Sequence, residues 1–272
     1  MKRYSALLGI PLVYCVLAVA QDTGTDRVVV PARNSSAARK VDVNIMGGSI
    51  TVKAYAGKEV IVEAKDSGSR SRRPDREDRN AQGMKRIDLP QRGLSVEEEN
   101  NVVTVRLQHS QNGDLNISVP ADTSLTLRTM HGEINVEGVK GELNVDSMNG
   151  KITLTSVSGS VLANTMNGQM TVVMDAVDAG KPLSFSSMNG TIDVTLPANF
   201  KSNVKLKTDH GDIYSDFDFQ MTNNGAVSQK NDSRDGKFKI KIDRTITGTI
   251  NGGGTDATFK TYNGTIYLRK KK

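Results

Sequence analysis

The side chains best suited to metal binding or proton transfer are three histidines, His109, His131 and His210. A metal site would need them beside other ligands, such as the carboxylates of Asp209 or Asp212. His131 and His210 lie far apart in the chain, and each stands directly before a glycine, where related segments carry asparagine. We therefore interpret both as turn residues and predict no metal site.

Paired carboxylates in one groove would be the signature of a carbohydrate-active enzyme. The acidic residues instead stand mostly one or three positions after a glycine, scattered among Asn, Thr and Lys: Glu133, Glu142, Asp193 and Asp212. In an alternating strand these positions point outward, so we expect a solvated face. We predict no catalytic residue, no cofactor-binding residue and no enzyme activity; a carbohydrate-active solenoid enzyme is the least favoured alternative.

Glycines at a strict nine-residue spacing dominate the middle of the chain: Gly132, Gly141, Gly150, Gly159 and Gly168. After each one, the second and fourth residues are mostly apolar and the first and third mostly polar. That alternation is typical of a strand with one buried face. Copies at looser spacing begin at Gly48, Gly190, Gly211 and Gly264. Repeats of this kind bury their apolar face only by stacking.

Two kinds of corner alternate along the repeat. Met-His-Gly or Met-Asn-Gly recurs at 130–132, 148–150 and 166–168, and Val-Lys-Gly or Val-Ser-Gly recurs with the same period between them, at 139–141 and 157–159. Two unlike corners per unit predict one coil of a two-sided solenoid, in which each strand pairs with its equivalent one coil later. The predicted fold is all-β, a parallel β-solenoid of two-strand coils of about 18–22 residues. We prefer it to an antiparallel meander with Asn-Gly hairpins.

The repeat also assigns structural roles to the residues before each glycine. Apolar residues two positions earlier are predicted to pack at the corner: Met130, Val139, Met148, Val157, Met166 and Met188. Ser or Thr one step earlier can bond its hydroxyl to the turn backbone: Thr129, Ser147, Thr165, Ser187, Thr208 and Thr261. Asn-Gly pairs supply residues that tolerate positive φ.

The N-terminus has the parts of a secretory signal peptide. Lys2 and Arg3 precede an apolar run, residues 6–20, which ends on the small residues Ala18-Val19-Ala20. We predict cleavage after residue 20, with an uncleaved membrane anchor as the alternative. Cleavage removes the only cysteine, Cys15, so disulfides are excluded, and it lowers the formal net charge from +6 to +4. This modest charge and the predicted export argue against nucleic-acid binding.

The remaining chain divides by composition. Residues 21–40 are predicted to be an extended segment, and 41–272 a β-solenoid domain with a β-rich N-terminal part. Two polar stretches, 66–93 and 223–236, are predicted loop insertions, and the arginines of the first could grip an acidic partner. The polybasic C-terminus, residues 267–272, is expected to cap a terminal strand edge.

Several motifs together resemble a known family. They are Asn116-Ile-Ser-Val-Pro120, Gly132-Glu-Ile-Asn-Val136, Ser187-Met-Asn-Gly-Thr-Ile-Asp-Val194 and Thr261-Tyr-Asn-Gly-Thr-Ile-Tyr-Leu268. From about Val41 to Arg269 the chain resembles the bacterial "putative adhesin" domains of unknown function, relatives of toast-rack-type β-solenoids. The resemblance implies an extracytoplasmic β-solenoid, in the periplasm, on the cell surface or secreted. It carries no ligand and no active-site residue.

Two functional hypotheses follow. The first is a non-catalytic, secreted or envelope-associated scaffold for interaction or adhesion, whose partner is an unknown envelope protein or a surface polymer. The alternative is an envelope regulatory or stress-related domain that binds another protein, through its arginine-rich loop. Aromatic residues are few, although Tyr214, Tyr262 and Tyr267 could form a small sugar-stacking platform.

Overall fold

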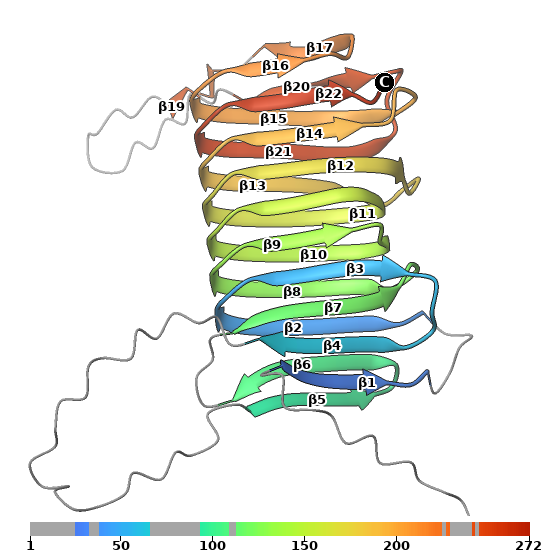
Figure 1. The fold of residues 1–272 in the computed structure, drawn as a ribbon. Helices are drawn as coiled ribbons and strands as arrows, with labels where there is room; N and C mark the ends of the chain where they lie inside the picture. Colours follow the sequence, from blue (N-terminus) through green and yellow to red (C-terminus); the bar gives the residue numbers. More distant parts are fainter. Residues whose placement is uncertain are drawn as a thin grey trace, which may run out of the picture.

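The computed structural model describes residues 25–32, 38–65, 93–108, 113–224, 227–228, 241–242 and 245–272. Every regular element within these ranges is a β-strand, and twenty of the strands form one sheet that winds around a long axis (Figure 1). A separate pair joins β18 (Val227–Ser228) and β19 (Lys241–Ile242). The predicted signal peptide and most of the two predicted loops lie outside the described residues.

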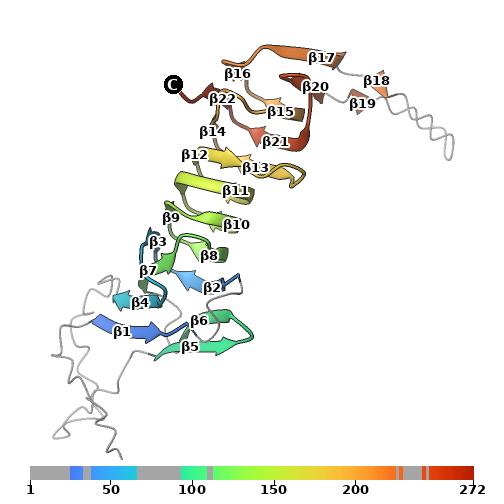
Figure 2. The same cartoon turned by 90° about the vertical axis from the view of Figure 1, so that its right-hand side faces the viewer.

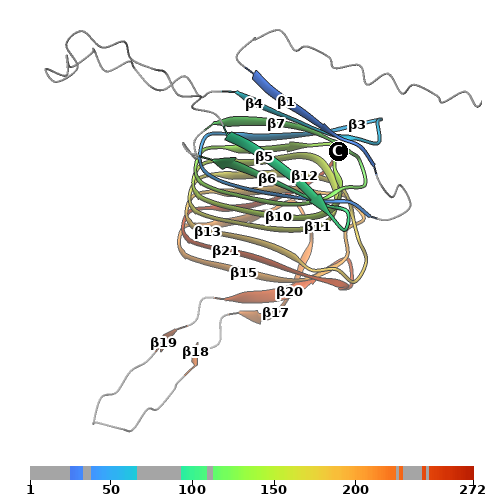
Figure 3. The ribbon, with the colours of Figure 1, turned by 90° about the horizontal axis from the view of Figure 1, so that it is seen from below.

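The coil has two faces, each a ladder of parallel strands. One face contains, in stacking order, β6 (Val102–Gln108), β2 (Lys40–Gly47), β8 (Ser124–His131), β10 (Lys140–Asn149), the second half of β11 (Ile152–Asn167), β13 (Leu183–Asn189), β21 (Thr255–Asn263) and β15 (Ser202–His210). The other contains β7 (Asp114–Pro120), β3 (Ile50–Tyr55), β9 (Ile134–Glu137), the first half of β11, β12 (Met170–Val177), β14 (Ile192–Leu196), β22 (Ile266–Lys270) and β16 (Ile213–Ser215). Figure 3 looks along the axis and shows the coils stacked over one another.

The predicted parallel β-solenoid is confirmed, and its centre has the predicted period. Asn149 pairs with Asn167 on the next coil, and Asn167 pairs with Asn189 on the coil after that. The sequence separations of these two pairs are 18 and 22. Equivalent corners therefore stack in register, one strand spacing of about 4.8 Å apart.

The stacking order departs from the chain order at both ends (Figures 1 and 2). β2 and β3 lie between the coil of β6 and β7 and the coil of β8 and β9. Likewise β21 and β22 lie between the coil of β13 and β14 and the coil of β15 and β16. The expectation that the polybasic C-terminus caps a strand edge is therefore wrong, because β22 pairs on both sides. Beside it, Lys271 reaches Asp175 with its Nζ at 2.7 Å from Oδ1.

Antiparallel strands close the two ends of the stack. At one end β5 (Gly93–Glu99) pairs with β6, and β4 (Val60–Lys65) joins β7 to β1 (Thr25–Val30). At the other end β20 (Ile246–Ile250) lies between β15 and β17 (Phe219–Asn224). β5 ends in Glu97–Glu99, of which Glu97 and Glu99 are exposed, and exposed charged side chains on an outer strand discourage pairing with another molecule.

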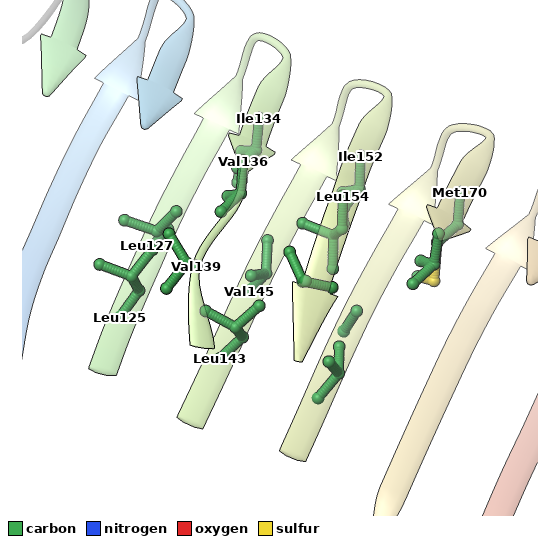
Figure 4. Close-up of a cluster of buried hydrophobic side chains, with 14 of the residues drawn as sticks. Leu125, Leu127, Ile134, Val136, Val139, Leu143, Val145, Ile152, Leu154 and Met170 are labelled. Atoms are coloured by element: carbon green, nitrogen blue, oxygen red, sulfur yellow. The ribbon is translucent and has the colours of Figure 1, made fainter. Parts of the chain in front are cut away.

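Alternating apolar side chains fill the space between the two faces (Figure 4). The second and fourth residues after most corner glycines are buried: Ile50, Val52, Ile134, Val136, Ile152, Leu154, Met170, Val172, Ile192, Val194, Ile266 and Leu268. Small Ala163 pairs with large Phe185 on the next coil, so a small side chain lies beside a large one. The Phe185 ring also stacks on the Phe259 ring, with the ring centroids 5.2 Å apart. A chain without tryptophan thus builds its core mainly from aliphatic columns, with a few phenylalanines.

Glycine at the Asn-Gly corner is required by close contact between coils. A Cβ atom added to Gly150 would overlap the carbonyl oxygen of Gly132, and one on Gly168 would overlap that of Gly150. The same contact continues along the column of corner glycines: Gly48, Gly132, Gly150, Gly168, Gly190, Gly264 and Gly211. The repeating glycine is therefore a packing requirement.

Replacing Gly150 by alanine should destabilise the fold by about 2–4 kcal/mol, since backbone must move to admit the methyl group. Gly180 is a matched control because nothing lies within 4 Å of a Cβ there, although its φ is +80°. Gly180→Ala should cost only about 1–2 kcal/mol, from the unfavourable φ. Urea unfolding followed by circular dichroism measures both, and equal losses would contradict the packing explanation.

A buried arginine fastens the N-terminal end of the stack. The Arg39 guanidinium donates to the carbonyl oxygens of Lys58 (3.0 Å) and Pro31 (2.6 Å) and lies 3.2 Å from Oε1 of Glu98. The side chains of this ion pair are only 9% and 6% exposed. One side chain therefore ties the outer strand β5 to the residue that follows β1 and to the loop between β3 and β4.

Arg39→Ala should destabilise the protein by about 3 kcal/mol, because it deprives the buried Glu98 carboxylate of this cation. Arg27→Ala is the control, since its ion pair with Glu63 is well exposed and should be worth less than about 1 kcal/mol. Thermal and urea unfolding of the two variants provide the comparison. Similar stabilities would show that the buried pair does not fasten this end.

Candidate interaction groove

Six large side chains at the Asn-Gly corner stand in solvent in a row along the axis. This methionine stripe consists of Met46, Met130, Met148, Met166, Met188 and Tyr262, which are 36% to 51% exposed. The prediction that the methionines pack at the corner is wrong, whereas the valines at the other corner, Val139 and Val157, are fully buried. The reason is the two-residue period of a strand: the residue before each methionine, Ile45 in one case and Ser or Thr in the others, points inward, so the methionine points out.

The stripe forms one wall of a groove of about 740 Å³. The buried hydroxyl residues lie between the walls as its floor, and Thr129, Ser147, Thr165 and Ser187 belong to them. The opposite wall carries polar residues two positions before the methionines, namely Asn44, Arg128, Asp146, Asn164 and Ser186, and continues with Lys260 and Lys207, which stand two positions before Tyr262 and Asp209. The groove therefore crosses successive coils parallel to the axis, with one apolar and one polar wall.

The floor is held by hydroxyl bonds to the glycine column. Ser187 Oγ donates to the carbonyl of Gly168 at 3.5 Å, and Thr261 Oγ1 to that of Gly190 at 3.1 Å. Thr165 and Thr208 make the equivalent bonds, which confirms the predicted hydroxyl role. Thr129 and Ser147 are equally buried, but their hydroxyls have no hydrogen-bond partner within the described residues.

The polar wall changes character along its length. Its middle is internally paired, since Arg128 Nε lies 3.4 Å from Asp146 Oδ2 and Asn164 donates to Asp146 Oδ1 at 3.0 Å. Beyond Ser186 it becomes basic, with Lys260 and Lys207 in adjacent strands. Tyr262 replaces methionine on the facing wall at this end. Asp209 lies beside Tyr262 in the same groove. The groove thus offers two environments, a charge-balanced one beside the methionines and one with two lysines and a carboxylate beside the tyrosine.

An asparagine ladder runs beside the stripe, one residue nearer the glycines. Asn167 donates to the side-chain oxygen of Asn149 at 2.9 Å, Asn189 to that of Asn167 at 2.8 Å, and Asn263 to that of Asn189 at 2.8 Å. The last amide in the series, that of Asn149, faces Nδ1 of His131 at 3.4 Å. Parallel in-register stacking of identical side chains makes such a ladder possible.

The histidines occupy the two ends of this ladder. His131 pairs with Asn149 and His210 with Asn263, so five strand spacings, about 24 Å, separate them. His109 lies outside the described residues. Within the described part of the chain no three His, Cys, Asp or Glu side chains come together, and the turn interpretation of His131 and His210 agrees with their places in the ladder.

The acidic residues named from the sequence do not converge on one place. Glu142 lies 3.1 Å from the Nζ of Lys181, and Asp193 lies 2.8 Å from the Nε of Arg269. The hydrogen bond and charge of Glu142, with those of Asp178, raise the pKa of Lys181 above its usual value. Glu133 and Asp212 are exposed on different coils. These contacts are those of ordinary surface ion pairs.

The three C-terminal tyrosines lie in two places. Tyr214 and Tyr267 stack on adjacent strands with ring centroids 5.4 Å apart, and Arg269 lies over the Tyr267 ring. Tyr262 instead contacts His210 edge-on at 5.1 Å, beside the groove. The three tyrosines therefore do not form one platform for sugar binding. Only Tyr214 and Tyr267 lie together, and their rings stack on each other.

The methionine stripe is the feature that the sequence interpretation missed. The signal that could have revealed it is the choice of residue, since the buried corner carries β-branched Val and the other carries Met. Methionine is flexible and polarizable, and it is favoured at adaptable binding surfaces.

Asn167→Ala should destabilise the fold by about 1–2 kcal/mol, because it breaks two ladder hydrogen bonds and leaves two partners unsatisfied. Asn135 is the matched control, an outward residue of β9 with no side-chain hydrogen bond to another described residue. Asn135→Ala should change stability by less than about 0.5 kcal/mol. Urea unfolding measures both, and an unchanged midpoint for Asn167→Ala would show that the ladder contributes nothing.

Two solved structures align with most of this chain. A proposed cell adhesion protein from Clostridium sporogenes aligns over 91% of this chain and 100% of its own, with 9% identity and a TM-score of 0.41. A proposed adhesin from Bacteroides fragilis aligns over 92% and 98%, with 11% identity and a TM-score of 0.38. At these TM-scores neither likeness supports a shared function. No curated protein matches the chain.

Two further findings bear on its class. Among the described residues there is no helix of the length and hydropathy needed to cross a membrane. The family model described as Toastrack DUF4097 matches residues 28–251, which is most of the solenoid. The chain therefore belongs to the Toastrack DUF4097 family.

Proposed function

We propose that the protein is a non-catalytic interaction scaffold of the cell envelope that holds a protein partner along the methionine groove. Its predicted signal peptide, residues 1–20, would deliver it outside the cytoplasm, and the solenoid of residues 41–272 would be the working domain. The observation that carries the proposal is the methionine stripe: six large, exposed side chains line one groove. Contiguous exposed apolar surface marks interaction sites.

The composition of the groove favours a protein over a polysaccharide as its occupant. Sugar rings are bound through aromatic faces, and Tyr262 is the one aromatic residue among the described residues that line the groove. Thioether side chains adapt to the apolar side chains of a polypeptide. The paired Arg128 and Asp146 on the opposite wall can meet polar groups of either sign. An extended segment with apolar residues on one side fits these two walls.

The regular scaffold explains why such a groove can exist. Each coil contributes one residue to each wall, so the groove grows by one strand spacing per coil. The alternative function, a regulatory or stress-related domain acting through residues 66–93, rests on the sequence alone, because that segment lies outside the described residues apart from Gly93.

A photocrosslinking experiment tests the groove. A benzophenone amino acid replaces Asn164, on the polar wall, in a chain expressed in its native host. We expect a discrete protein adduct, identified by mass spectrometry, whose yield falls at least about tenfold in the triple variant Met130→Asn, Met148→Asn, Met166→Asn. The matched control is Met221→Asn, since Met221 is 59% exposed on β17, away from the groove.

Three results would count against the proposal. An equal adduct yield from the triple variant would show that the stripe does not hold the partner. A protease-resistant adduct that stains as carbohydrate would favour a surface polymer instead. Loss of the adduct on deletion of residues 67–92, with the triple variant unaffected, would favour the regulatory alternative. Circular dichroism confirms that each variant is folded.

A further inference from the structure

The methionine stripe places one thioether on each of five successive coils. Met148 and Met166 are flanked by two directly paired positions, Ser147 with Thr165 and Asn149 with Asn167, so they lie side by side on neighbouring strands. The same flanking pairs place Met46 beside Met130, Met130 beside Met148, and Met166 beside Met188. All five line the same groove.

The strand spacing leaves room for a two-coordinate metal ion between neighbouring methionines. Identical side chains in the same conformation repeat at the strand spacing, about 4.8 Å. An ion midway between two such sulfur atoms would lie about 2.4 Å from each, close to the metal–sulfur bond length of about 2.3 Å found in zinc–thiolate sites. Thioethers are soft ligands, and among biological first-row metals they select Cu(I). We propose that the methionine stripe is a binding site for Cu(I).

Electrostatics favours the middle of the stripe. The Asp146 carboxylate stands on the opposite wall beside Met130, Met148 and Met166. It offsets the charge of Arg128, its ion-pair partner, whereas the Tyr262 end carries two lysines, Lys260 and Lys207, against one carboxylate, Asp209. A monovalent cation is therefore bound at the Met130–Met148–Met166 segment. Metals that prefer other ligands find no group of three His, Cys, Asp or Glu side chains in the described part of the chain.

This site is separate in chemistry from the proposed partner surface, although the two share side chains. A protein partner needs the apolar volume of methionine, whereas Cu(I) needs its sulfur atom. Leucine has a similar volume and no sulfur, so Met→Leu substitutions remove the metal site and keep the apolar wall. Met→Asn substitutions remove both. The two proposals can therefore fail independently.

Silver and copper titrations test the inference. The full chain is used with Cys15→Ser, because a thiol would itself bind both ions. Ag(I), a redox-inert probe of Cu(I) sites, is titrated calorimetrically, and Cu(I) is measured under ascorbate by competition with bicinchoninic acid. We expect one or two ions per chain. The variant Met130→Leu, Met148→Leu, Met166→Leu should bind at least about thirtyfold more weakly, a loss typical of removing metal ligands or their supports.

A control variant tests whether binding is specific to the groove, and X-ray absorption tests whether sulfur atoms are the ligands. Met221→Leu removes an exposed methionine outside the groove and should leave the affinity unchanged. X-ray absorption of the Cu(I)-loaded protein should show sulfur neighbours at about 2.3 Å. Affinity equal in the triple leucine variant and the parent, a first shell of nitrogen and oxygen, or no uptake by the parent would each overturn the inference. The photocrosslinked adduct should survive in the leucine variant, which separates loss of metal from loss of the partner.

Discussion

Everything in this molecule depends on the contact between stacked corner glycines. Two backbones approach so closely at each Asn-Gly corner that not even a methyl group fits between them. That contact holds neighbouring coils in register at one corner, and the register aligns every other column. The hydroxyl floor, the asparagine ladder and the methionine stripe are consequences of it, because each is the same repeat position followed along the axis.

The sequence predicted the repeating part of the fold well because a strand of period two and a strict glycine spacing leave few solutions. Val139 and Ile152 point inward as the alternation requires, and the length of the central coil follows from two unlike corners. The order of the coils was not predictable in the same way. Gly48, Gly211 and Gly264 begin equivalent strands, and nothing local distinguishes one parallel neighbour from another. Only the whole set of pairings decides which coil lies next to which.

The groove shows where pattern-based reasoning on this chain fails. An apolar residue at a corner is normally assigned to the core, and for Val157 that assignment is right. Met148 occupies the matching place at the other corner and points outward, since its buried neighbour Ser147 has already taken the inward position. At most of these corners the inward hydroxyl bonds to the backbone of the adjacent coil, so polar groups lie inside and thioethers outside. Residue type alone does not reveal that the hydroxyl residue points inward and the methionine outward. The alternation of inward and outward positions along the strand does reveal it.

The place of β21 and β22 has a consequence for how the chain assembles. The strands β15 and β16 have no direct pairing with the coil of β13 and β14, because the last residues of the chain form the coil between them. Residues 202–216 therefore have no native parallel partner in the stack until β21 and β22 are in place. Their parallel partners are residues 255–270, so this end of the stack closes only after that later segment has been made. Shortening the C-terminus would accordingly remove an inner coil of the stack and leave the outermost one unsupported.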